Sequence, residues 1–188
     1  MTILNHPSDG LHSELIVLAR TVGFEGMIDE DSLLKVCANP GSSARVGGSL
    51  SRWSRLGLFN RDGEKVQLNK PFSIKRGQSV DEWTDELPSA CRKLALDPKN
   101  CLPLWGDNQG VSADFAKGVA WLLAQDIFQL PRAFKGGFER LEDAQIKGEK
   151  IIQNDTRLSA LRFWARYCGF ATSRSRFGLV RGVAALMK

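Results

Sequence analysis

The chain has 188 residues, of which 43% are hydrophobic and 25% are charged, and its formal net charge is +5 at pH 7. This composition is typical of a globular protein with a proper core, and the length suffices for one compact domain or two small ones. No apolar run approaches the roughly 20 residues that a membrane helix needs, and the amino terminus lacks the pattern of a signal peptide. We therefore expect a cytoplasmic protein that contacts no membrane.

Charge alternates along the chain in four blocks. Residues 41–76 carry eight basic and two acidic side chains, and residues 130–188 carry twelve and five. The other two blocks, 1–40 and 77–129, are each net acidic by four charges. Two separate basic blocks favour an anionic partner such as nucleic acid. Lysines and arginines that only solvate two exposed faces would give the same counts, and this alternative stays open.

Two helices are expected before the first basic block. Leucine and valine recur at spacings of four, three and four through residues 11–22, which predicts a helix that ends near Gly23. Asp29 can cap a second helix, and Pro40 with Gly41 stops it. The first two helices of a small domain are therefore in place by residue 40.

A third helix with two different faces is expected within residues 43–57. Val46, Leu50 and Trp53 fall on one line of this helix and predict its buried side. The residues that fall roughly on the other side are Arg45, Gly48, Arg52 and Arg55.

Two short strand-like runs follow this helix and are joined across Asp62 and Gly63. Three helices and a hairpin thus succeed one another within about 70 residues, which is the order of a winged helix-turn-helix domain. In such a domain the third helix enters the major groove of DNA and the hairpin forms the wing.

Gly47 and Gly48 are unfavourable inside the third helix, because each costs about 1 kcal/mol relative to alanine. Either the helix starts later, near Ser49, or the absence of side chains at these two glycines has a function that offsets their cost. At Gly48 a bare backbone could approach a phosphate closely. The two alternatives are equally open.

Residues 73–110 are predicted to form a helical linker. Ser79 and Glu82 have the spacing of a capping box, and Pro88 is expected to split or kink the helix that they begin. Residues 103–110 are typical of a loop. The expected domains are therefore a winged helix at residues 1–72, the linker at 73–110 and a second domain at 111–188.

The second domain repeats a motif of the first. Leu50-x-x-Trp53-x-Arg55 has a counterpart in the helix that includes Leu161-x-x-Trp164-x-Arg166, and both tryptophans are predicted to be buried. A long helix is expected at residues 112–128, and residues 170–171 could pair with 177–180 as a hairpin. We therefore predict a mainly α protein with short β-hairpins, built from two tandem winged-helix-like units. A plain helical bundle with a basic surface is the alternative for the second unit.

Catalytic and metal-binding patterns are scarce. The two histidines, His6 and His12, have no ligand-spaced partner, and the four cysteines include no C-x-x-C pair. Neither a phosphate-binding loop nor a nucleophile elbow occurs. Asp143 and Lys147 have an acid-lysine spacing found in metal-dependent nucleases, but the second carboxylate that a metal would require is missing. We expect no enzyme activity, no cofactor, no metal, and buried free thiols.

Three stretches of the sequence carry a resemblance to a known family. ILNHPSDGLHSELIVLAR at the start, LSRWSRLGLFNRDGEKVQLN in the first basic block and RFWARYCGFA in the second are similar to the DpdG-like proteins. That family occurs in bacterial defence clusters that modify DNA with seven-deazapurines and restrict unmodified DNA. The resemblance implies a DNA-binding accessory of an antiviral restriction system, without an established activity of its own, beside other subunits of a defence complex.

Two hypotheses of function follow. In the first, the protein binds duplex DNA as a regulator or accessory subunit of a restriction system. In the second, its winged helices are protein-interaction scaffolds in a larger complex without direct DNA contact; a homodimer is compatible with both. Steep loss of DNA binding with salt would favour the first. The residues predicted to contact DNA are Ser43, Arg45, Gly48, Ser49, Arg52, Arg55, Arg61, Lys65, Arg162, Arg166 and Arg174.

Overall fold

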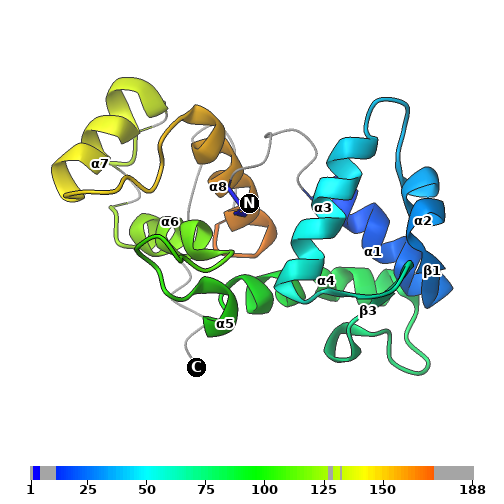
Figure 1. Cartoon of the computed structure of the whole chain (residues 1–188). Helices are drawn as coiled ribbons and strands as arrows, with labels where there is room; N and C mark the ends of the chain where they lie inside the picture. The colour runs from blue at the N-terminus through cyan, green and yellow to red at the C-terminus, as the bar shows by residue number, and fades with distance from the viewer. Residues whose placement is uncertain (1, 5–11, 127–128, 132, 172–188) are drawn as a thin grey trace. The chain divides into compact units, whose positions relative to one another are not determined.

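The computed structural model describes residues 2–4, 12–126, 129–131 and 133–171. Within these residues the chain is mainly helical, with eight α-helices and one three-stranded antiparallel sheet. The chain divides into two compact units. We call Gly10–Asn100 the sheet unit, and Met1–Asp9 together with Cys101–Lys188 the helical unit. Figure 1 colours the sheet unit from blue to green and the helical unit mostly from green to orange.

The sheet unit contains three helices before its hairpin and one after it. Its elements are α1 (Ser13–Glu25), β1 (Met27–Asp29), α2 (Glu30–Cys37), α3 (Ser43–Leu56), β2 (Phe59–Asp62), β3 (Lys65–Leu68), the 3-10 turn η1 (Lys70–Phe72) and α4 (Val80–Ala95). The predicted order of helix, helix, helix and hairpin is confirmed. Strand β1, between the first two helices, was not predicted.

Local capping signals in the sequence are confirmed at two helix starts. The Asp29 carboxylate accepts the N–H of Ser32 at 3.0 Å and begins α2. Ser79 and Glu82 form the capping box of α4, in which the Ser79 hydroxyl accepts the Glu82 N–H and the Glu82 carboxylate accepts the Ser79 N–H. Pro88 lies inside α4, which continues to Ala95, so of the two predicted effects, a split or a kink, the split does not occur.

The small sheet has the order β1-β3-β2, with both pairs antiparallel. Val66 at its centre pairs with Ile28 on one side and Arg61 on the other, and its side chain is fully buried. The turn between β2 and β3 includes Gly63, whose φ of 59° is in the left-handed region that glycine adopts without strain. The hairpin predicted across Asp62 and Gly63 is therefore confirmed.

Helix α3 begins at Ser43 and passes through both glycines without interruption. The alternative of a later start near Ser49 is therefore wrong. Val46, Leu50 and Trp53 are buried as predicted, with Trp53 at 0% exposure. The helix ends at Gly57, whose φ is 94°.

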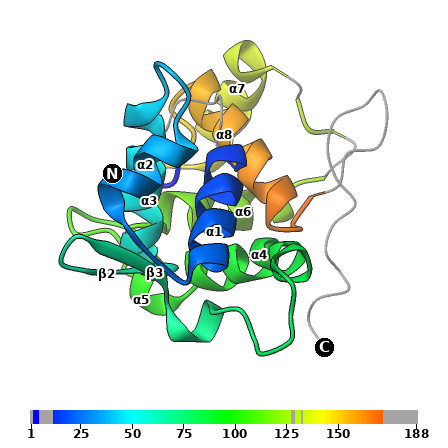
Figure 2. The same ribbon diagram turned by 90° about the vertical axis from the view of Figure 1, so that its right-hand side faces the viewer.

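Helix α1 lies at the centre of the sheet unit, where it packs against α2, α3, α4 and β3 (Figure 2). Leu15, Leu18 and Val22 supply its buried side. Helix α4, which follows the hairpin, is held to α1 by Arg20, which lies 2.6 Å from the Asp81 carboxylate and donates to the Thr84 hydroxyl. The core of this unit therefore extends beyond the hairpin to α4.

The helical unit is built around the packing of α6 (Ala113–Leu123) on α8 (Asp155–Tyr167). Their approach is close at Gly118, where an added Cβ would lie 2.9 Å from the Leu161 side chain. Trp164 is 1% exposed, as predicted. The remaining elements of this unit are the irregular turn η2 (Phe134–Phe138) and α7 (Glu139–Gln145). The short helix α5 (Pro98–Cys101) includes the boundary between the units, since the sheet unit ends at Asn100.

Several other sequence predictions have different outcomes. The helix expected at 112–128 ends at Leu123, while residues 127 and 128 lie outside the described part of the chain. Residues 177–180 of the predicted second hairpin and His6 also lie outside it. The four cysteines are free thiols, and three of them are buried. No helix in the described ranges is long and apolar enough to cross a bilayer.

Candidate nucleic-acid interface

One side of α3 is accessible along its whole length. Ser43, Ala44, Ser51 and Arg55 are exposed, and Gly47 between them is partly exposed. After the adjacent pair Ser43 and Ala44, the positions recur at spacings of three and four, so they form one stripe, which we call the α3 stripe. An added Cβ at Gly47 would meet no atom within 4 Å. The stripe therefore combines small residues, over which another molecule can approach the backbone closely, with one arginine at its carboxyl end.

Two residues that were expected to contact DNA lie on the inner side of α3. Arg52 is 3% exposed and Ser49 is 2% exposed, so the expectation that Arg52 lies on the side of the helix away from its buried residues is wrong. The reason is that α1, α2 and β2 all pack against α3. The buried arc of the helix is consequently wider than the single line of apolar residues that the sequence shows.

Arg45 and Gly48 lie at the borders of the α3 stripe. The side chain of Arg45 is 40% exposed, and its Nε lies 3.4 Å from a carboxylate oxygen of Glu14 on α1. Gly48 is partly exposed. Because Glu14 balances the charge of Arg45, a phosphate would compete with this carboxylate for the guanidinium.

The hairpin carries charges of both signs. Arg61 and Lys65 are exposed as predicted, and so are Asp62 and Glu64 between them. Arg61 makes an ion pair of 3.1 Å with Glu30 in the first turn of α2. Exposed ion pairs contribute only about 0–1 kcal/mol, so such a guanidinium can exchange its carboxylate for a phosphate at little cost.

In the second basic block, residues 130–188, Arg162 is less accessible to a partner than the sequence indicates. Arg162 donates to the carbonyl of Pro131 at 3.3 Å and lies over the ring of Phe138, 5.0 Å from its centroid. Burial lowers the pKa of this guanidinium from its ordinary value. Arg166 is exposed on α8, and Arg174 lies outside the described residues. Arg162 therefore has a packing role within the helical unit.

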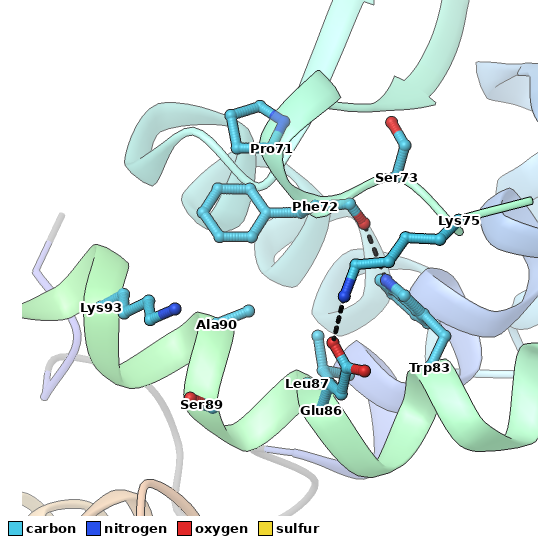
Figure 3. A pocket seen from close by; sticks show the side chains of 10 residues that line it. All are labelled: Pro71, Phe72, Ser73, Lys75, Trp83, Glu86, Leu87, Ser89, Ala90 and Lys93. Carbon is cyan, nitrogen blue, oxygen red and sulfur yellow. Dashed lines mark hydrogen bonds and ion pairs between the residues drawn. The ribbon is translucent and has the colours of Figure 1, made fainter. Parts of the chain in front are cut away.

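A groove in the sheet unit involves residues that were not predicted to belong to a site. It has a volume of about 360 Å³ and lies between η1 and α4. Figure 3 shows Lys75 reaching toward Glu86, 3.6 Å away, and the indole of Trp83 directed at the carbonyl of Phe72, which accepts its N–H at 2.7 Å. Lys93 also lines the groove. The nearest signal in the sequence is the aromatic pair Phe72 and Trp83 beside several lysines. This pair was divided between the predicted winged helix, which ends at residue 72, and the predicted linker.

The arrangement offers groups suited to binding an anion or a nucleic acid. Within the part of the chain that the structure describes, no three His, Cys, Asp or Glu side chains gather as a metal site. The accessible basic and hydroxyl groups of the sheet unit instead include Ser43, Ser51, Arg55 and Lys65, on α3 and on the hairpin that follows it.

Comparison with known proteins identifies a family. The model of the family described as DpdG-like matches residues 1–184, which is nearly the whole sequence. No curated protein and no solved structure matches the chain. The resemblance seen in three stretches of the sequence thus extends over both units.

Proposed function

The chain belongs to the DpdG-like family, part of the Dpd DNA-modification defence family, and from this premise we propose that it binds duplex DNA as an accessory or regulatory protein of such a defence system. Membership of a DNA-modification defence family makes DNA the expected binding partner. The α3 stripe is the surface that would contact it. The protein acts in this proposal by binding, without catalytic activity of its own.

The sheet unit is the DNA-binding domain in this proposal, with the topology of a winged helix. Its element order α1-β1-α2-α3-β2-β3 and its strand order β1-β3-β2 support this assignment. Residues 38–42 connect α2 to α3, as the turn of a helix-turn-helix does. Helix α3 is then the recognition helix, and the hairpin β2–β3 is the wing.

The observation that carries the proposal is the accessibility of the α3 stripe. The major groove is wide enough for an α-helix, and small residues let the helix backbone approach the bases. Ser43 and Ser51 can donate hydroxyl hydrogen bonds, and Arg55 can contact a phosphate or a guanine edge. Arg45, once released from Glu14, would add a second cation on the same helix.

The other predicted residues have three roles in this proposal. Arg61 and Lys65 contact the phosphate backbone beside the groove, as wing residues do. Arg52 and Ser49 hold α3 from inside and do not reach the DNA. Exposed Arg166 would contact DNA only through the helical unit, as a second binding surface.

A second candidate function is a protein-interaction scaffold. Several large apolar side chains of α1, β1 and α2 are exposed: Val17 at 44%, Phe24 at 78%, Met27 at 45% and Val36 at 70%. A contiguous patch of exposed apolar side chains marks a surface that meets another protein, so a scaffold function requires that these four side chains be covered together by one partner. Such contacts, to another defence subunit or to a second copy of the chain, are compatible with DNA binding by α3.

Titration of a labelled duplex of random sequence at several salt concentrations tests the proposal. We expect binding that weakens steeply with salt, with a log-log slope of about 0.9 for each phosphate neutralised. Arg55→Ala should weaken binding and lower the slope by about one. Arg140→Ala, which removes an exposed arginine of α7 in the other unit, is the matched control.

Two outcomes would decide against the proposal. If the parent protein shows no binding at low salt, it does not bind duplex DNA. If Arg55→Ala binds like the parent while Arg166→Ala loses binding, the contact surface is α8 and not α3.

A further inference from the structure

The end of α1 presents an aromatic ring to the solvent. Phe24 has the most exposed of the large apolar side chains in the described part of the chain, at 78%. Glu25 and Gly26, which follow it, are also exposed. Gly26 ends the helix with a φ of 74°, which glycine adopts without strain. A phenyl ring beside a carboxylate therefore projects from the turn between α1 and β1.

The groove between η1 and α4 has the complementary shape. Its apolar lining includes Phe72, Leu87 and Ala90, and its volume of about 360 Å³ falls in the range of pockets that take an apolar group, about 300–1,000 Å³. Figure 3 shows the Phe72 ring on the η1 side of the groove and Ala90 on the α4 side. An aromatic side chain that entered between them would contact apolar groups on both sides.

The charge at the open end of the groove is opposite to that of the turn. Lys75 is paired with Glu86, 3.6 Å away, whereas Lys93 lines the groove about two turns further along α4. Within the residues that the structure describes, neither Lys93 nor Glu25 makes an ion pair. An acid beside an exposed ring and a lysine beside an apolar groove are complementary in charge as well as in shape.

Phe24 and the groove belong to neighbouring parts of the sheet unit. An added Cβ at Gly23 would lie 3.0 Å from the side chain of Ile74, and Ser73 and Lys75 on either side of Ile74 line the groove. Phe24 does not fill the groove of its own chain, since its ring is mostly exposed. In a two-fold symmetric dimer every contact occurs twice, so an anchor and a pocket close together on one copy can meet those of a second copy reciprocally.

We propose that the occupant of the groove is Phe24 of a second copy of this chain. In the dimer each Phe24 ring lies between Phe72 and Ala90 of the other copy, and each Glu25 carboxylate meets a Lys93 ammonium. Buried aromatic anchors of this kind dominate the affinity of protein interfaces. The contact is narrower than the scaffold surface considered above, because it uses the turn and the groove alone, and it does not depend on duplex binding by α3.

Sedimentation velocity of the full chain without DNA measures self-association. The parent should shift from one copy to two as its concentration rises through about 1–100 μM, the weak end of protein interfaces. Phe24→Ser should raise the dissociation constant about a hundredfold or more, because each dimer loses two anchors. Leu123→Ser, which truncates a side chain of 48% exposure on α6, is the control and should associate as the parent does.

A mixture of two variants tests whether the ring enters the groove. Ala90→Trp fills the groove and should also prevent self-association, while its own Phe24 stays intact. Mixed with Phe24→Ser, whose groove is intact, it should form a dimer through the one remaining anchor and pocket. Neither variant alone should do so.

Exchange of charge provides a second test, which also applies if Ala90→Trp is unfolded by circular dichroism. Glu25→Lys and Lys93→Glu should each weaken self-association about tenfold, because each turns two attractive contacts into repulsive ones. The chain with both changes has opposite charges across the interface again, so it should associate within about threefold of the parent.

Four outcomes would overturn the proposal. They are a parent that remains a single copy at about 200 μM, self-association of Phe24→Ser equal to that of the parent, no association in the mixture of folded variants, and a double charge variant as weak as the single ones. A monomeric parent would make a different protein the partner of this surface. Because the measurements contain no DNA, each of these failures leaves duplex binding by α3 unaffected.

Discussion

The carboxylate of Asp114 at the start of α6 accepts the backbone N–H of Leu4 at 2.9 Å, across 110 residues of sequence. Ile3 and Leu4 are buried, with 1% and 0% exposure. The other oxygen of Asp114 accepts the N–H of Phe115. Residues near the start of the chain thus belong to the core of the helical unit, although the residues that follow them begin the sheet unit.

Removal of this carboxylate should destabilise the helical unit. Asp114→Ala leaves the buried N–H of Leu4 without its acceptor, and we expect a loss of about 1–3 kcal/mol in the free energy of unfolding. Urea titration followed by circular dichroism measures it. Asp107→Ala, at an exposed loop position, should change stability by less than about 0.5 kcal/mol. Equal stability of the two variants would show that the Asp114 hydrogen bond contributes nothing.

Arg52 and Arg55, both on α3, should respond in opposite ways to truncation. Arg52→Ala removes a buried side chain and should cost about 1–3 kcal/mol of stability. Arg55→Ala removes an exposed one and should leave stability within about 0.5 kcal/mol while weakening duplex binding. Thermal melting and DNA titration of both variants give the comparison. If Arg52→Ala melts like the parent and Arg55→Ala does not, the face assignment of α3 is wrong.

Gly47 provides a test in which stability and binding change in opposite directions. Gly47→Ala introduces a better helix former where no atom lies within 4 Å, so we expect a gain of about 0.5–1 kcal/mol in stability. If the α3 stripe approaches DNA closely, the added methyl group should weaken duplex binding. A variant that is more stable and binds DNA as tightly as the parent would place Gly47 outside the interface.

Gly118 in α6 is the matched contrast, because a Cβ there would lie 2.9 Å from two methyl carbons of Leu161. Gly118→Ala should therefore lower stability, by about 1–3 kcal/mol, despite its better helix propensity. Chemical unfolding of the two glycine variants side by side checks the sign of each change. Stabilisation by Gly118→Ala would mean that α6 and α8 can separate at no cost.

The capping box of α4 predicts a pH dependence. Hydrogen bonds from the backbone N–H and then the hydroxyl of Ser79 lower the pKa of Glu82 from its ordinary value. A carboxylate of this kind contributes stability above its unfolded pKa, near about 4.3, and loses it as pH falls through the lower folded value. The stability of the parent should therefore fall more steeply below about pH 4.5 than that of Glu82→Gln. Parallel curves in urea titrations at several pH values would contradict this.

What could be predicted from the sequence depends on interactions between close neighbours along the chain. The Asp29 cap and the Ser79–Glu82 capping box each join residues three positions apart, and the hairpin follows from a glycine turn between two short strands. Burial of Trp53 and Trp164 follows from helical spacing, which is also local. The family resemblance is likewise carried by contiguous stretches of sequence.

What only the tertiary structure decided concerns contacts between distant segments. Arg52 is buried because α1 and α2 cover α3 from more than one side, and no pattern within α3 itself reveals the width of that cover. The hydrogen bond between Leu4 and Asp114 and the network of Gln109, Lys117 and Glu149 likewise join residues from separate elements. A periodic pattern indicates which side of a helix is apolar, but the exposure of each side chain depends on how many other elements pack against the helix. The candidate site was therefore predictable as a helix and a hairpin, whereas the residues that reach its surface were decided by packing.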